Sequence, residues 1–329
     1  MLPSSTDLIR SARVVAIPLR QPFRGITVRE AVLFEGPEGW SEFSPFIEYG
    51  DSEASTWLAA AIDFAYTELP PLLRDRIAVN ATLPAVAPDA VRGVLDAFPG
   101  ARTIKVKVAE IGQTLADDVA RVAAARHYLG PLGRIRIDAN ANWNVDEAEH
   151  AIHAMAGYDL EYVEQPCASI DELADIRGRV KYMGIPIAAD ESVRKADDPL
   201  EVVRAGAADL LVIKAQPLGG IHSARRIIAA AGLPVVVSSA LDTSVGISMG
   251  AFLAASLPEL DYDCGLGTTA LLEADVSANP ITIVDGAIDV RRVDVDPSLL
   301  ERHAASADRT AWWLDRLGRC HGLLAAHAN

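Results

Sequence analysis

The stretch DLLVIKAQPLGGIHSARRIIAAAGLPVVVSS, residues 209–239, decides the fold class of this chain. Its two ends, DLLVIK and LPVVVSS, are short apolar, β-branched runs that finish in polar residues, as buried strands of a parallel sheet do. Between them, apolar residues from Ile221 to Ile228 fall on one helix face, and Gly232 follows as a stop signal. The stretch therefore predicts a strand, a helix and a second, parallel strand.

The same alternation extends toward the N-terminus. Four more runs have this character: TIKVKV (103–108), RIRID (134–138), LEYVE (160–164) and IPIAAD (185–190). At least six such units indicate an α/β fold, either an open doubly wound sheet or a closed barrel. No GxGxxG motif follows any run, and the even spacing favours the barrel. We expect Asn80 on the first barrel strand and residues 261–267 near the last.

The segments on either side have a different pattern. Residues 14–46 contain three runs typical of antiparallel strands, and a helix is expected from about 53 to 69. This α+β unit precedes the barrel. After Pro280, the string ITIVDGAIDVRRV predicts a hairpin that turns at Asp285-Gly286, followed by a loose helix whose end frays from Arg316.

Composition limits the classes of function. The 329 residues are half hydrophobic and carry a net charge of −15, without a Lys/Arg-rich run, which argues against nucleic acid and anionic membranes as partners. The N-terminal residues do not resemble a signal peptide, and no apolar window approaches ~18 residues. Three cysteines form no CxxC pair, so we expect a reduced, cytoplasmic setting. The sequence does not define the oligomeric state.

Charged residues recur at the C-terminal ends of the predicted strands, where barrel enzymes place their chemistry. They are Lys105, Lys107, Asp138, Glu164, Asp190 and Lys214. From Lys107 onward, the successive spacings are 31, 26, 26 and 24 residues, so each residue falls at the same point of its unit. A role as a loop residue or salt-bridge partner would explain any one of these residues equally well. It would not explain six at equivalent positions, because burying so many charges is costly.

Three carboxylates from adjacent strands predict a metal site made of oxygen ligands. Asp138, Glu164 and Asp190 suit Mg²⁺, or Mn²⁺ as a substitute, whereas the absence of His and Cys from the set argues against Zn²⁺. Glu191 is a neighbouring acid, and strand alternation alone would turn only one of the pair inward.

The lysines flank this predicted metal site. Lys105 and Lys107 are two residues apart and face the same side, while Lys214 lies on the strand beyond the acids. The arrangement suits removal of a proton next to a carboxylate, because a divalent cation stabilises the resulting dianion. The lysine base must be neutral near pH 7, and neighbouring positive charges, together with partial burial, lower its pKa.

Several motifs together resemble the enolase superfamily, muconate-lactonizing-enzyme subgroup. The motifs are KVK (105–107), DAN (138–140), EQP (164–166), DES (190–192) and IKAQPLGG (213–220). Longer strings, FRGITVRE (23–30) and VVVSSALDTSVG (235–246), resemble the o-succinylbenzoate synthase family of actinobacteria. The resemblance covers most of the chain. It implies a (β/α)7β modified TIM barrel at 79–280, with an α+β capping domain formed by 1–78 and the returning segment 281–329.

The resemblance also implies roles for individual residues. Lys107 would be the acid/base catalyst, and Lys214 would stabilise the enediolate. Lys105 would depress the pKa of Lys107, and Asn140 would be a supporting or substrate contact. Asp138, Glu164 and Asp190 would bind Mg²⁺. The implied reaction is the syn dehydration of 2-succinyl-6-hydroxy-2,4-cyclohexadiene-1-carboxylate to 2-succinylbenzoate in menaquinone biosynthesis.

Contacts to the rest of the substrate are less specific in the sequence. We expect the loop PLRQPFRGI to fold over the barrel mouth, where Arg24 would meet the succinyl carboxylate; a solvated loop arginine explains the residue equally well. Ser238, Ser239 and Thr243 follow a strand and would bond the substrate, although a polar strand terminus is an equal alternative. His150 and His153 are expected on a solvated helix face, and Trp312-Trp313 is expected to anchor the C-terminal segment on the cap.

Three other functions stay open at this point. An N-succinylamino acid racemase, a dipeptide epimerase or a cycloisomerase would use the same lysines and metal. A metal-free barrel lyase, with Lys107 or Lys214 forming a Schiff base, leaves the three acids unexplained. A non-catalytic binding barrel predicts that replacement of Lys107 has no effect on turnover.

Overall fold

The computed structural model describes residues 2–195 and 198–327, so the terminal residues of the expected cap lie outside it. Seven parallel strands form one curled sheet in the order β11-β10-β9-β8-β7-β6-β5. They are β5 (Ala81–Leu83), β6 (Thr103–Lys107), β7 (Arg134–Asp138), β8 (Leu160–Glu164), β9 (Ile187–Ala189), β10 (Leu210–Ile213) and β11 (Val235–Val237). All six predicted runs are strands of this sheet, which confirms the α/β barrel class.

Two isolated bridges close the barrel. Ser238 pairs in parallel with Gly265, and Val79 pairs in parallel with Cys264. The predicted positions of Asn80 and of residues 261–267 are therefore confirmed, since Asn80 follows directly on one bridge. The eighth strand consists of these bridges alone, because the chain at 264–265 is in register for only two residues.

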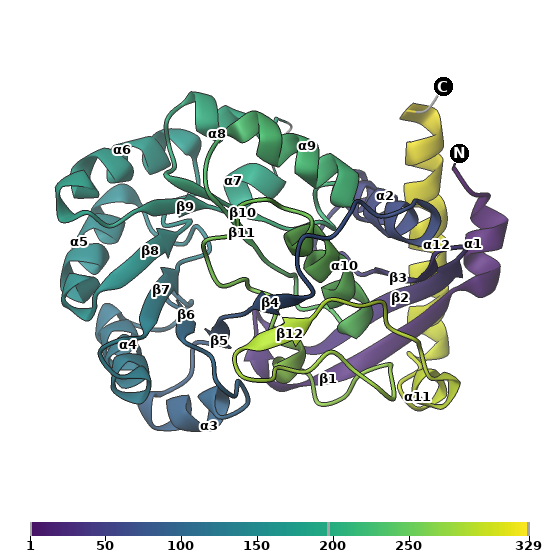
Figure 1. The fold of residues 1–329 in the computed structure, drawn as a ribbon, viewed down its shortest axis with the longest axis horizontal. Coiled ribbons are helices and arrows are strands. Elements are labelled where there is room, and N and C mark those ends of the chain that lie inside the picture. The colour runs from purple at the N-terminus through teal and green to yellow at the C-terminus, as the bar shows by residue number, and fades with distance from the viewer. Residues whose placement is uncertain (1, 196–197, 328–329) are drawn as a thin grey trace.

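Helices cover the outside of the curled sheet (Figure 1). They are α3 (Val91–Leu95), α4 (Leu115–Leu129), α5 (Val145–Met155), α6 (Ile170–Val180), α8 (Glu201–Arg204), α9 (Ile221–Ala231) and α10 (Ser244–Ala255). The short helix α7 (Glu191–Arg194) lies instead at the end of the sheet where Arg194 lines a pocket. Short 3-10 turns lie at Pro88–Ala90, Ala156–Tyr158, Lys181–Met183 and Thr268–Leu271. Helix α9 ends as the sequence predicts, because Gly232 adopts a left-handed conformation at φ 63° that glycine allows without strain.

The cap is an antiparallel sheet between helices. Strands β1 (Arg13–Phe23), β2 (Ile26–Gly36) and β3 (Gly39–Phe43) pair in sequence order, and α1 (Ser5–Ser11) and α2 (Asp51–Tyr66) accompany them. The long helix α12 (Ala307–His327) packs against α2, and both chain ends lie on this side of the molecule (Figure 1).

Helix α12 anchors the C-terminal segment on the cap, as predicted for the tryptophan pair. Trp313 is fully buried, its ring meets Phe43 edge-on at 6.0 Å between centroids, and its indole N–H donates to Glu30. The prediction of a loose, fraying end is wrong. Arg316 is also buried and donates to the carbonyl oxygens of Phe46 and Tyr49, so the helix continues to His327.

The predicted hairpin after Pro280 is only partly correct. Its turn forms, with positive φ at Asp285 and Gly286, but a single bridge, Val284 to Ala287, joins the two arms. The second arm, β12 (Ala287–Asp289), pairs instead with β4 (Arg76–Ala78), and α11 (Pro297–Arg302) follows it. The hairpin pattern was misleading because the backbone groups of β12 find their partners more than 200 residues earlier in the chain.

A buried carboxylate joins the cap to the barrel. Glu42 on β3 accepts hydrogen bonds from the backbone N–H groups of Thr243 and Gly246 and from the Thr243 hydroxyl, all at the N-terminus of α10. Such free N–H groups favour an anion. Burial and the nearby charge of Asp242 nevertheless raise the pKa of Glu42 to about 7.

We expect the Glu42→Gln variant to lose less stability than wild type as pH rises from 5 to 8. The unfolded chain releases the Glu42 proton at a lower pH than the folded protein does, so folded stability falls as pH rises from about 4.5 to about 7. Above pH 7, ionisation of Glu42 is expected to lower the free energy of unfolding by on the order of 3 kcal/mol. Urea unfolding at both pH values measures it. Ser44→Ala, which removes one hydrogen bond and keeps the carboxylate, is the control; equal pH slopes in wild type and Glu42→Gln would contradict the prediction.

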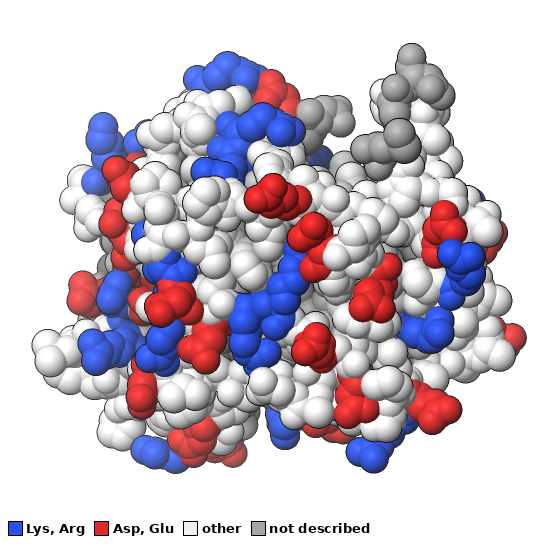
Figure 2. Space-filling model, turned by 45° about the vertical axis from the view of Figure 1, so that its right-hand side comes forward, with Lys and Arg blue, Asp and Glu red and all other residues white. Residues whose placement is uncertain are grey.

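The surface is mixed in charge on the face that Figure 2 shows, with basic and acidic side chains interspersed over it. Across residues 2–195 and 198–327, none of the helices combines the length and the apolar character needed to cross a membrane.

Candidate active site

Two lysines of β6 point into the barrel. The side chains of Lys105 and Lys107 are 8% and 10% exposed, and each ammonium group faces a carboxylate. Lys105 Nζ lies 2.9 Å from Oε1 of Glu164, and Lys107 Nζ lies 2.5 Å from Oδ2 of Asp138. The prediction that both lysines share one side of the strand is confirmed.

Strand register brings the acids to the same level of the barrel. Lys107 pairs with Asp138 and Asp138 pairs with Glu164 across β6, β7 and β8. Asp190 follows β9 directly and is 1% exposed, and Lys214 Nζ approaches its Oδ2 to 2.5 Å. Three lysines and three acids from five neighbouring strands thus converge inside one mouth, as their sequence spacing predicted.

Burial and mutual charge set the protonation of this cluster. Burial, together with the charge of Asp138, raises the pKa of Glu164 to about 7. Burial lowers the pKa of Lys107, and Lys105 lowers it further against the opposing effect of Asp138. Burial also lowers the pKa of Lys105, but Glu164 and Asp138 outweigh that effect and raise it. The pKa of Lys107 is therefore lowered, as expected. Burial, rather than the neighbouring cations, is the largest cause.

The donor set fits a hard divalent cation. Asp138, Glu164 and Asp190 offer only oxygen atoms, and Glu164 feels the negative charge of both other acids. In the described part of the chain, no three His, Cys, Asp or Glu side chains already stand in metal-binding geometry, because each of these acids is paired with a lysine. A cation competes with those ammonium groups for the same oxygens.

Asn140 connects Lys107 to a second group of charges. Its Oδ1 accepts from Lys107 at 2.6 Å, and its Nδ2 lies 3.3 Å from Oε1 of Glu191. Glu191 begins helix α7, so the strand alternation expected to turn only one of Asp190 and Glu191 inward does not apply there. Both acids contact Arg194, and Asp190 is also bonded to Lys214.

The sequence analysis missed Arg194, which is 6% exposed. Its guanidinium lies 3.2 Å from Asp190 and 2.6 Å from Glu191, and it donates to the Tyr49 hydroxyl at 2.9 Å. A signal for it exists, because an arginine three and four residues after two acids is the spacing of helical ion pairs.

One pocket lies above the cluster, at the junction of barrel and cap. It is lined by Phe23, Arg24, Phe46, Tyr49, Trp57, Thr82, Lys105, Lys107, Asn140, Arg194, Lys214, Ser238, Ser239, Ala240, Leu241, Gly265 and Thr268. Five of these residues are cationic, and among the described residues no acidic one lines the pocket. The loop that carries Phe23 and Arg24 covers the mouth, as expected, and the wall as a whole suits an anionic ligand.

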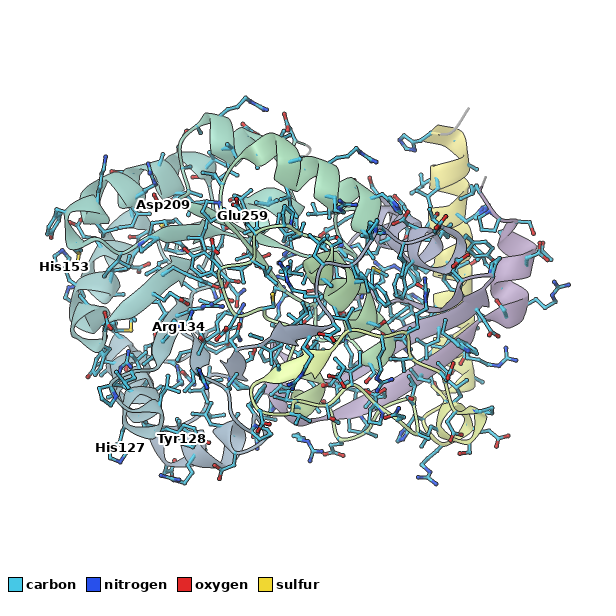
Figure 3. All side chains as sticks on the ribbon, in the orientation of Figure 1. His127, Tyr128, Arg134, His153, Asp209 and Glu259 are labelled. Carbon is cyan, nitrogen blue, oxygen red and sulfur yellow. The ribbon has the colours of Figure 1, made fainter. Side chains whose placement is uncertain are left out.

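Other predicted residues lie in different environments. Ser238 and Ser239 line the pocket, whereas the Thr243 hydroxyl is buried against Glu42 and also caps α10 by accepting from the Val245 N–H. His153 is exposed on the outer side of α5, where its ring meets the Tyr182 hydroxyl at 2.9 Å (Figure 3). The solvated helix face expected for His153 is confirmed.

Comparison with known families places both parts of the chain. Residues 89–294 match the family described as enolase C-terminal domain-like, and residues 14–65 match the family described as enolase N-terminal domain-like.

Curated relatives match over nearly the whole chain. The o-succinylbenzoate synthase of Mycobacterium tuberculosis (strain CDC 1551 / Oshkosh) is 54% identical over 98% of this chain and 98% of its own. The o-succinylbenzoate synthase of Mycobacterium ulcerans (strain Agy99) is 53% identical over 97% and 95%, respectively.

Solved structures share the fold at lower identity. The L-Ala-D/L-Glu epimerase from Bacillus subtilis superposes with a TM-score of 0.74 at 26% identity, covering 86% of this chain and 96% of the epimerase. The muconate lactonizing enzyme from Pseudomonas fluorescens gives a TM-score of 0.76 at 20% identity, covering 90% and 98%.

Proposed function

The chain belongs to the enolase superfamily and, within it, to the o-succinylbenzoate synthases, and from this premise we propose how its residues carry out the reaction. The reaction is the syn dehydration of 2-succinyl-6-hydroxy-2,4-cyclohexadiene-1-carboxylate to 2-succinylbenzoate, a hydro-lyase step in menaquinone biosynthesis, which we assign to the cytoplasm. The observation that carries the assignment of residues is the buried arrangement of Lys107, the three acids and Lys214 around one cationic pocket.

In this proposal, Asp138, Glu164 and Asp190 would bind Mg²⁺. When bound, it supplies positive charge against the negative charge that develops on the substrate's ring carboxylate. The protein's contribution is a buried set of oxygen donors whose mutual repulsion, visible in the raised pKa of Glu164, favours a cation.

Lys107 is the proposed acid/base residue. Its lowered pKa increases the fraction of neutral amine, which removes the proton next to the ring carboxylate. The same ammonium group then donates that proton to the departing hydroxyl, so hydrogen and hydroxide leave from one face as water. Aromatisation of the ring favours this second step. Asn140 fixes the lysine through a 2.6 Å contact.

Lys214 and the pocket wall stabilise the rest of the substrate. Lys214 enters from the strand on the opposite side of the acids and places a cation against the enediolate. Arg24 is proposed to meet the succinyl carboxylate, and Ser238 to donate to a substrate oxygen. Ser239 also lines the pocket, but its hydroxyl already donates to the Gly265 carbonyl at 2.7 Å. Thr243 is not included, because its hydroxyl is already bonded to Glu42.

A second activity, racemisation of an N-succinylamino acid, is favoured by one specific observation. Lys107 and Lys214 both line the pocket and come from opposite sides of the acid set, so one lysine can remove the α-proton from one face while the other donates a proton to the opposite face. Such a substrate would also carry two carboxylates.

The assignment is tested by direct assay. Purified protein with Mg²⁺ is given the cyclohexadiene substrate, and the loss of diene absorbance is followed. Rapid loss that yields 2-succinylbenzoate is expected. No loss in folded, metal-loaded protein would reject the synthase assignment, and turnover of an N-succinylamino acid alone would assign the chain to the racemase.

A further inference from the structure

One group of residues lining the pocket, separate from the lysines and acids, is rich in hydrogen-bond donors. The Tyr49 hydroxyl accepts from Arg194 at 2.9 Å and from Arg24 at 3.5 Å. Two arginines from distant parts of the chain, one in the cap loop and one in α7, therefore meet at a single phenol oxygen.

The other groups near Tyr49 are also donors or cations. Trp57 lines the same wall, and its buried indole N–H has no hydrogen-bond partner within the described residues. Lys195 Nζ lies 5.0 Å from the centroid of the Tyr49 ring. Arg24 stacks on Phe46 at 4.4 Å, which holds its guanidinium plane in place.

The nearby acids do not face the ligand. Glu191 contacts Arg194 but does not line the pocket, so it offsets the charge of Arg194 from behind. Glu48 lies 3.9 Å from Arg24 and its side chain is 55% exposed, so this ion pair is weak. A donor wall backed in this way fits a carboxylate, which only accepts hydrogen bonds.

We propose that Arg194, with Arg24, Tyr49 and Trp57, forms the subsite for the substrate's second carboxylate, and that Tyr49 keeps the two guanidiniums together before the ligand arrives. This rests on the proposed function, which supplies a substrate with two carboxylates. Arg194 also contacts Asp190, so the subsite and the proposed metal ligand share one guanidinium.

The shared guanidinium gives the subsite a positioning role as well. A carboxylate that draws Arg194 toward itself changes the partner set of Asp190, which Lys214 contacts from the other side. Substrates without the second carboxylate are therefore expected to be turned over more slowly, as well as to bind less tightly.

Binding of the product separates these roles from turnover. Calorimetric titrations compare 2-succinylbenzoate with its analogue in which the succinyl carboxylate is a carboxamide, on Mg²⁺-loaded protein. Wild type is expected to bind the diacid at least ~10-fold more tightly, the size of a hydrogen bond to a charged group. Arg194→Gln is expected to lose most of that preference. Trp57→Phe, which keeps an aromatic ring, and Tyr49→Phe are expected to lose part of it.

Arg226→Gln on α9 is the matched control, because Arg226 is an exposed arginine outside the pocket, and its preference should equal that of wild type. A titration with Mg²⁺ alone shows whether Arg194→Gln has disturbed the metal site.

Two results would overturn the proposal. One is equal binding of both ligands by wild type. The other is an equal loss of affinity for both ligands in Arg194→Gln, which would mean that Arg194 acts only through its contact with Asp190. Failure of the proposed function itself is seen separately, as absence of turnover of the cyclohexadiene substrate by wild type.

Discussion

Replacement of Lys107 by alanine is expected to slow dehydration by at least ~100-fold, the lower end of the effect of removing an acid/base group. The amine that takes and returns the proton is lost, whereas Asp138 keeps a cationic partner in Lys105 at 3.3 Å. The variant should therefore fold. Steady-state rates with saturating substrate and Mg²⁺ measure the effect on turnover.

Lys181→Ala is the matched control for this experiment, because Lys181 is an exposed lysine on the outer side of the barrel. Product affinity and the thermal unfolding midpoint of Lys107→Ala should stay close to those of wild type. A Lys107→Ala protein with near wild-type turnover would reject the acid/base assignment and favour a binding barrel.

Removal of divalent metal is expected to reduce activity by at least ~100-fold, because several kcal/mol of charge stabilisation is lost. The protein is treated with EDTA, its metal content is verified, and its rate is compared before and after addition of Mg²⁺. Rebinding should restore the rate and also raise the unfolding temperature, because the metal binds the folded acids and not the unfolded chain.

EDTA saturated with Mg²⁺ before addition is the control for effects of the chelator itself. Undiminished turnover by verified metal-free protein would contradict the metal assignment. Trapping of the substrate by borohydride on Lys107 or Lys214 would then support the Schiff-base lyase.

The barrel could be predicted because buried parallel strands leave a direct trace in the sequence. Runs such as RIRID at 134–138 and LEYVE at 160–164 coincide with β7 and β8 to the residue. Segments whose partners are distant left no such trace. The example is β12, which pairs with β4 more than 200 residues earlier rather than with its neighbour.

The cluster of lysines and acids could be predicted for the same reason, since Lys107, Asp138 and Glu164 lie on consecutive, in-register strands. The donor wall could not. Tyr49 belongs to the cap and is 145 residues from Arg194, and only the packing of cap on barrel brings them together. In the sequence, Trp57 has the pattern of an ordinary core residue of α2, and only the structure shows that its indole N–H has no hydrogen-bond partner among residues 2–195 and 198–327.

The return of helix α12 to the N-terminal sheet has a consequence for synthesis of the chain. The cap core contains Phe34 and Phe43 from the start of the chain and Trp313 and Leu317 from its end. At ~5–20 residues per second, Trp313 follows Phe43 by roughly 14 to 54 seconds. Throughout that interval, the part of the cap core that Trp313 and Leu317 complete in the folded protein has no covering helix.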